Sequence, residues 1–125
     1  MKSAIEDRRR HQRYILANSV TVNPEGAFQV VDLGKGGFCF KCPPYTAILD
    51  QWIADILTST GVLEAYPAKK AWVNFHANGT SSLPLLMHVG VKFGGLAKSQ
   101  QYRLTKLISS ICSVQLPHIT GPPLS

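Results

Sequence analysis

Short strand-like segments alternating with turn-forming residues constrain the fold of this chain more than any other feature of its sequence. Five such segments cover residues 14–22, 27–33, 38–42, 63–76 and 85–93, and most are separated by proline or glycine. Runs of this kind, followed by a single helix, are typical of closed antiparallel architectures. The pattern predicts a mainly β fold, a small β-barrel with the helix packed on it.

The segment 48–60 fits two predictions. Its apolar residues from Ile48 to Leu57 fit a short helix that Asp50 would cap. Residues 52–60 also fit a strand that ends in a Ser-Thr-Gly turn. The residue pattern alone leaves both alternatives open.

The clearest helix is predicted between Ser99 and Val114, with Ser99 as its N-cap. Its apolar residues have the i, i+3, i+4, i+7, i+8 spacing of a buried stripe, at Leu104, Leu107, Ile108, Ile111 and Cys112. Pro117 and a later Gly-Pro-Pro run predict a non-helical tail over residues 115–125. A length of 125 residues then predicts one domain over 14–114, preceded by a flexible arm over 1–13.

The arm concentrates positive charge in four arginines, Arg8, Arg9, Arg10 and Arg13. They account for four of the six net positive charges and leave +2 on the rest of the chain. A local basic cluster suits a single phosphate ligand better than a long duplex, which favours a broad basic face. The sequence therefore predicts no nucleic acid polymer as partner.

Targeting signals and cysteine usage bear on the compartment. The first residues are charged and no apolar run of suitable length follows them, unlike a signal peptide, and no stretch is apolar enough to span a bilayer. Three cysteines form no disulfide framework, which favours a reducing compartment. We expect a cytoplasmic protein that does not insert into membranes.

Catalytic motifs are missing from the sequence. It has no Gly-x-Ser-x-Gly elbow and no His-Glu-x-x-His, and no acidic cluster suggests acid–base work or a hard metal ion. The turn Gly34-Lys35-Gly36-Gly37 lacks the Gly-Lys-Ser/Thr ending of a phosphate-binding loop, and Cys39 stands where a dinucleotide fingerprint has its third glycine. We expect neither an enzyme nor a cofactor.

Cys39 and Cys42 have the C-x-x-C spacing of zinc and redox sites. Residues three apart in a strand point to opposite faces, so the two thiols are expected to diverge. A second C-x-x-C is missing and the four histidines show no ligand spacing. Buried structural thiols, and no metal site, are the favoured prediction.

The arginine run alone fits a solvated tail, a non-specific nucleic-acid contact or a specific anion clamp. Guanidinium favours the clamp, since its planar fork bonds phosphate and guanine O6/N7 bidentately. Asp32, at the entrance of the glycine turn, adds a carboxylate that accepts bonds from guanine N1–H and N2–H₂. Together the two segments predict a site for a guanine nucleotide.

Here the chain resembles the PilZ domain, a bacterial receptor module for cyclic di-GMP. The family pattern is Arg-x-x-x-Arg before the first strand and Asp/Asn-x-Ser-x-x-Gly between the second and third strands. The first motif is matched by Arg9 and Arg13, and the second by Asp32 and Gly37, with Gly34 in place of the family's serine. The segment Val-Gly-Val-Lys-Phe at 89–93, followed by a helix, resembles the family's last strand and packing helix.

The resemblance implies a six-stranded antiparallel barrel with a helix, which favours a strand in the ambiguous middle segment. It also implies that Arg9 and Arg13 clamp cyclic di-GMP, that Asp32 reads guanine and that Gly37 shapes the turn. Arg8 and Arg10 are secondary phosphate contacts at best. The arm would become ordered over the ligand, and a partner effector protein would recognise the changed surface. The resemblance implies that the process controlled is motility, exopolysaccharide production or biofilm formation.

Gly34 is the departure from the family pattern. A lost hydroxyl removes one hydrogen bond, worth about 0.5–1.5 kcal/mol, so we expect retained but weaker binding. Two alternatives stay open: a divergent PilZ module that binds no nucleotide and acts as a protein-interaction domain, and a small nucleic-acid-binding barrel. The second needs exposed stacking aromatics, whereas Phe28, Phe38 and Phe40 are expected in the core.

Overall fold

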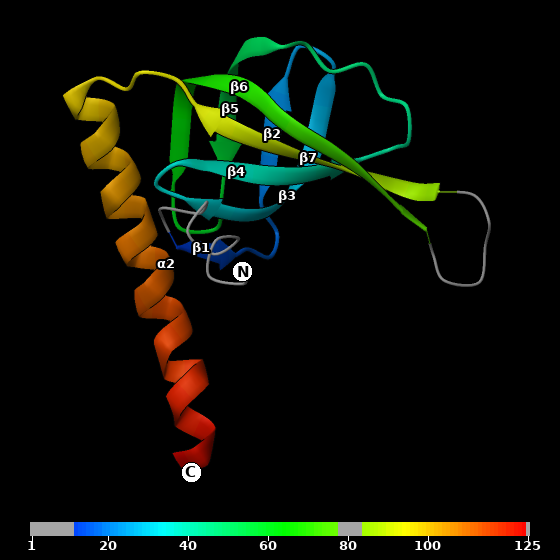
Figure 1. Cartoon of the computed structure of the whole chain (residues 1–125). Coiled ribbons are helices and arrows are strands. Elements are labelled where there is room, and N and C mark those ends of the chain that lie inside the picture. The colour runs from blue at the N-terminus through cyan, green and yellow to red at the C-terminus, as the bar shows by residue number, and fades with distance from the viewer. Residues whose placement is uncertain (1–11, 78–83, 125) are drawn as a thin grey trace, which may run out of the picture.

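The computed structural model describes residues 12–77 and 84–124 and shows a barrel with a long helix along one side (Figure 1). Its elements are β1 (Arg13–Ile15), β2 (Val20–Asn23), β3 (Gly26–Gly34), β4 (Gly37–Cys42), β5 (Gln51–Leu57), β6 (Val62–Ala77), β7 (Pro84–Phe93) and α2 (Lys98–Leu124). All strand pairs are antiparallel. The predicted mainly β fold with a C-terminal helix is confirmed.

Closure of the sheet makes it a six-stranded barrel. The strands follow the order β1-β3-β2-β5-β6-β7-β4, and an additional pairing of β3 with β4 joins the two ends. Strands β1 and β2 both pair with β3, at opposite ends of it, so they act as two halves of one broken strand. The sequence pattern predicted a single strand over 14–22. It is interrupted because Asn18 takes a left-handed conformation with φ of 54°.

The ambiguous middle segment is strand β5, as the family resemblance implied. Trp52, Ala54 and Ile56 are buried, while Ile53 between them and Leu57 after them are exposed. This alternation is the period-2 pattern of a strand with one face in the core. A helix over these residues is therefore excluded.

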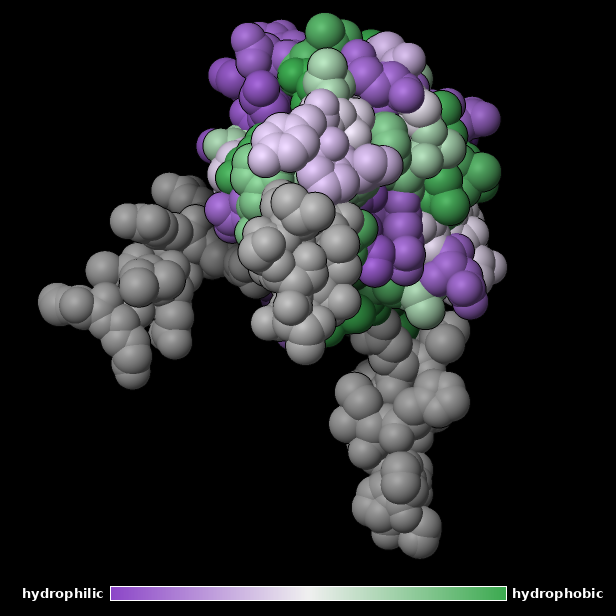
Figure 2. All heavy atoms as spheres, turned by 90° about the vertical axis from the view of Figure 1, so that its right-hand side faces the viewer, coloured by the Kyte–Doolittle hydropathy of each residue, from purple (hydrophilic) through white to green (hydrophobic). Residues whose placement is uncertain are grey.

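The barrel interior is filled by large apolar side chains from every long strand. The core includes Val30, Leu33, Phe38, Phe40, Ile56, Leu63, Tyr66, Met87, Val89 and Val91. The predicted core positions of Phe38 and Phe40 are confirmed, and Phe28 stacks on Phe40 with ring centroids 5.6 Å apart. On the outer surface seen in Figure 2, hydrophobic and hydrophilic residues are interspersed.

Helix α2 packs its predicted apolar stripe against the barrel. Leu104, Leu107, Ile108 and Ile111 are all buried, and the helix contacts β6 and β1. Gln100 fastens its first turn, because the side-chain Nε2 donates to the carbonyl oxygen of Ala65 at 3.1 Å. The packing helix inferred from periodicity is therefore present and faces the core as expected.

Both predicted ends of this helix are wrong. It begins at Lys98, so Ser99 is not its N-cap; instead Gln100 Oε1 accepts from the Ala97 backbone N–H at 2.9 Å, one half of a capping box. The helix also continues through Pro117 to Leu124, where a non-helical tail was expected. Proline removes one N–H donor but fixes φ near the helical value, so it weakens a helix without always ending it.

Within the described residues, no helix combines the length and apolar character needed to cross a membrane.

Candidate functional site

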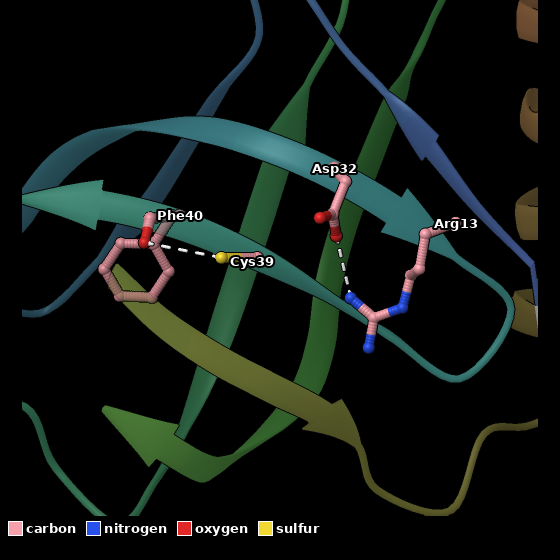
Figure 3. Close-up of polar contacts among 4 residues, drawn as sticks. All are labelled: Arg13, Asp32, Cys39 and Phe40. Atoms are coloured by element: carbon pink, nitrogen blue, oxygen red, sulfur yellow. Dashed lines mark hydrogen bonds and ion pairs between the residues drawn. The ribbon is translucent and has the colours of Figure 1, made fainter. Parts of the chain in front are cut away.

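Two of the predicted site residues, Arg13 and Asp32, meet on the outer face of the barrel. Nη1 of Arg13 donates to Oδ1 of Asp32 at 2.8 Å, and the two side chains are only 19% and 21% exposed (Figure 3). The pairing of β1 with β3 produces this contact, because it sets Arg13 opposite Gly34 and Ile15 opposite Asp32. The structure therefore joins the arginine motif to the aspartate motif.

A β-bulge directs Asp32 away from the core. Across the β3–β4 pair, Val30 lies opposite Phe40, but Asp32 lies opposite Cys39, so one extra residue sits between them on β3. In a regular strand without the bulge, Asp32, two residues after Val30, would share the face of Val30, which is fully buried. The bulge thus keeps the carboxylate on the outer face and returns Leu33 to the core.

Gly34 is where β1 approaches β3 most closely. A Cβ atom at this position would lie 2.5 Å from the backbone oxygen of Gln12 and 3.0 Å from Cδ of Arg13. The absence of a side chain lets Arg13 lie across β3 and reach Asp32. The glycine thus has a steric role of its own, in addition to the missing hydroxyl noted in the sequence.

Gly37 is where the glycine turn meets β7. A Cβ atom here would overlap the carbonyl oxygen of Val91 and lie 3.0 Å from Cα of Lys92. On the same side, the Phe93 backbone N–H donates to the carbonyl oxygen of Gly36 at 2.9 Å. The turn is therefore held against β7 by backbone contacts that only glycine permits at position 37.

An aromatic side chain lies in the same row of cross-strand neighbours as Asp32, on the outer face of the barrel. We call the residues Asp32, Cys39, Gly90 and Trp72 the outer row. Cross-strand neighbours run from Asp32 to Cys39, from Cys39 to Gly90 and from Gly90 to Trp72. The indole of Trp72 covers Gly90, since a Cβ there would overlap its ring, yet Trp72 remains 42% exposed. Because the indole lies over Gly90, two strand spacings separate it from Asp32, roughly 10 Å.

Trp72 was not among the residues predicted from the sequence. A signal for it exists in hindsight: Gly90 interrupts an alternating strand, which marks a close approach by another group. The register between β6 and β7 that brings Trp72 there depends on a bulge between Lys70 and Trp72. This register is a long-range property that strand propensity does not encode.

The outer row offers two different binding ends. At one end a guanidinium and a carboxylate supply charged donors and acceptors, and at the other a half-exposed indole supplies a stacking surface. Between them lie Cys39, which is 4% exposed, and Gly90, which the indole of Trp72 covers. Arg8, Arg9 and Arg10 lie outside the described residues.

The cysteine pair agrees with its structural interpretation. Cys39 lies on the outer row and Cys42 in the core, both buried, and neither they nor Cys112 on α2 forms a disulfide. The predicted divergence of Cys39 and Cys42 is confirmed. Burial raises the pKa of the Cys42 thiol. Over residues 12–77 and 84–124, no group of three His, Cys, Asp or Glu side chains is arranged to hold a metal ion.

Comparison with known proteins supplies relatives by fold rather than by sequence. The sequence matches no protein-family profile and no curated protein significantly. MrkH of K. pneumonia in complex with c-di-GMP aligns with a TM-score of 0.71 and 14% identity, over 86% of this chain and 53% of that one. The chain thus spans about half the length of MrkH.

The PilZ domain of YcgR from Escherichia coli, solved with c-di-GMP, aligns over nearly its whole length. The TM-score is 0.71 and the identity 14%, over 92% of this chain and 98% of that domain. A larger YcgR structure, also with c-di-GMP, has a TM-score of 0.63 and is covered over 46% of its length. The closed barrel of antiparallel strands, followed by a packing helix, therefore gives this chain the PilZ fold.

Proposed function

We propose that this chain is a receptor domain for cyclic di-GMP. MrkH and YcgR, whose fold it shares, were solved in complex with that nucleotide, but at 14% identity the fold alone does not identify a ligand. The observation that carries the proposal is the Arg13–Asp32 pair at 2.8 Å on the outer face. These are the residues of the two family motifs, brought together from 19 positions apart.

The chemistry of the pair suits guanine. A carboxylate accepts from the adjacent N1–H and N2–H₂ donors of guanine, and a guanidinium donates to its O6/N7 edge or to phosphate. In the free protein Asp32 accepts from Arg13. Ligand binding would then exchange this contact for contacts of both groups with the nucleotide, so little charge is left without a partner during binding.

Trp72 extends the proposed site to a second base. With one guanine at Asp32, roughly 10 Å of outer surface leads to the half-exposed indole. Stacking on an aromatic side chain contributes about 1–3 kcal/mol per base. A ligand with two bases uses both ends of the row, whereas a mononucleotide would use one. The row therefore favours a dinucleotide.

The remaining roles follow the family pattern. We propose that Arg9 completes the clamp with Arg13, with Arg8 and Arg10 as secondary phosphate contacts, and that Gly37 shapes the turn. The domain would signal to an effector protein rather than catalyse a reaction. We place it in the cytoplasm, in keeping with three cysteines, Cys39, Cys42 and Cys112, that form no disulfide.

Isothermal titration calorimetry of the full chain with cyclic di-GMP tests the proposal. We expect saturable heat with the wild type and much weaker binding by the Arg9→Ala variant, because charged hydrogen bonds contribute about 1.5–3 kcal/mol each. Cyclic di-AMP serves as the control for guanine recognition. Equal heats for wild type and Arg9→Ala would contradict the clamp, and no heat with the wild type would favour the protein-interaction alternative.

Gly34 gives a prediction that separates steric from hydrogen-bonding effects. We expect Gly34→Ala and Gly34→Ser each to lower the free energy of unfolding by about 1–2 kcal/mol, because the new Cβ displaces the Gln12 carbonyl. The serine variant should bind cyclic di-GMP a few-fold to about tenfold more tightly than the alanine variant, through its added hydroxyl. Urea denaturation and calorimetry measure the two effects. Equal affinities for the two variants would exclude a role for the hydroxyl.

Trp72 gives a second prediction. We expect Trp72→Ala to weaken binding of cyclic di-GMP by roughly tenfold, since about 1–3 kcal/mol of stacking is lost. Trp72→Phe should retain most of the affinity. Tyr102→Ala is the matched control, because Tyr102 is an exposed aromatic on α2, away from the outer row. Equal losses for Trp72→Ala and Tyr102→Ala would contradict the stacking role.

A further inference from the structure

The net charge of the chain is divided unevenly between its two halves. Residues 1–64 contain seven basic and seven acidic residues, whereas residues 65–125 contain six basic residues and no acidic one. The second half forms most of β6, all of β7 and helix α2. Positive charge on these elements therefore has few neighbouring carboxylates to balance it.

Two lysines of this half face each other across the β6–β7 pair. Lys69 lies directly opposite Lys92, and both are exposed on the outer face. Like charges at directly opposed positions destabilise a sheet. Asp50, on the neighbouring segment, is 3.4 Å from Nζ of Lys70. Among the described residues, neither Lys69 nor Lys92 forms an ion pair with a carboxylate.

The lysine pair borders the row that joins Asp32 to Trp72. Lys92 lies opposite Gly37 on one side and Lys69 on the other, two residues along β7 from Gly90. Two residues of strand span about 7 Å, which is within reach of a lysine side chain. Gly37 carries no side chain beside Lys92, and the indole of Trp72 covers Gly90 next to it. The cationic pair is thus placed beside the end of the row that Trp72 occupies.

We propose that Lys69 and Lys92 form an anion subsite for a phosphodiester group of a cyclic dinucleotide bound between Asp32 and Trp72. The subsite rests on the proposed function and adds to it a contact outside both sequence motifs. A bridging phosphate relieves the repulsion between the two ammonium groups. It also gives a ligand with two phosphates an advantage over a mononucleotide, whose phosphate stays near Arg13.

The test uses the full chain with Lys69→Gln, Lys92→Gln and the double variant. We expect each single change to weaken cyclic di-GMP binding roughly tenfold and the double change about a hundredfold, since charged hydrogen bonds are lost. Affinity for GMP should change less than about threefold, because that ligand reaches only the Asp32 end. Melting temperatures of the free variants should equal or exceed that of the wild type, as a repulsive pair is removed.

Lys106→Gln on α2 is the matched control, because it makes the same change in net charge on an exposed lysine outside the strands. An equal loss of affinity in Lys106→Gln and Lys92→Gln would show a general charge effect and overturn the subsite. Unchanged cyclic di-GMP affinity in the double variant would overturn the subsite and leave the proposed function intact. Equal losses for GMP and cyclic di-GMP would overturn the assignment to a phosphate away from the Asp32 end of the row. A wild type that binds no cyclic di-GMP would overturn both proposals.

Discussion

Replacing Arg13 by alanine is expected to weaken cyclic di-GMP binding by roughly a hundredfold, the largest loss of affinity among single substitutions in the proposed site. Two opposing effects contribute. The variant loses charged hydrogen bonds from the guanidinium fork to the ligand, each worth about 1.5–3 kcal/mol. It also frees Asp32 from its ion pair at 2.8 Å, which for a partly exposed pair is worth about 1 kcal/mol or less. The loss therefore exceeds the gain.

Calorimetry on Arg13→Ala, with Arg103→Ala on α2 as a charge-matched control, measures this effect. Asp32→Ala adds a test of base recognition, because it removes the acceptor for guanine N1–H and N2–H₂ and should remove the preference for cyclic di-GMP over cyclic di-AMP. If Arg13→Ala bound more tightly than the wild type, the Arg13–Asp32 contact would be inhibitory and the clamp assignment would be wrong.

Replacing Gly37 by alanine is expected to lower the free energy of unfolding by about 3 kcal/mol and the melting temperature by roughly 10 °C. The new Cβ would overlap the carbonyl oxygen of Val91, a backbone atom that cannot rotate away. Strands β4 and β7 would have to separate where they pair, at Gly37 opposite Lys92. The substitution is therefore expected to destabilise the pairing of β4 with β7, which helps to close the barrel.

Urea denaturation followed by circular dichroism measures the stability of Gly37→Ala. Gly95→Ala is the matched control, since a Cβ at position 95 has no heavy atom within 4 Å, and surface changes of this kind stay within about 0.5 kcal/mol. A Gly37→Ala variant as stable as Gly95→Ala would show that the turn can shift at little cost, and would contradict the close backbone contact with β7.

The sequence predicted the strands and the packing helix well because their signals are local. Alternation of apolar residues along β4 and β7, and the 3.6-residue period of Leu104, Leu107 and Ile111, depend only on neighbours along the chain. The ends of α2 were predicted less well. The capping contact of Gln100 and the passage of the helix through Pro117 depend on energies of a few kcal/mol that composition does not resolve.

The residues of the candidate site also fall into two groups, those that local sequence signals predicted and those that they did not. Arg13 and Asp32 were recognisable from motif chemistry, because a guanidinium fork and a carboxylate have few equivalents for reading guanine. Trp72 and the Lys69–Lys92 pair were not, since their positions depend on the register between β6 and β7, including a bulge. A shift of β6 by one residue in that register would turn Trp72 and Lys69 to the other face.

By itself, the sequence determined the order of strands and helix, the apolar content of the core and the residue types that could recognise a nucleotide. Only the tertiary structure decided that Arg13 reaches Asp32, that Gly34 and Gly37 are needed for close backbone contacts, and which side chains share the outer row. The physical reason is that strand pairing joins residues far apart in the chain. Register, bulges and barrel closure are fixed by the packing of all strands together, and no single segment encodes them.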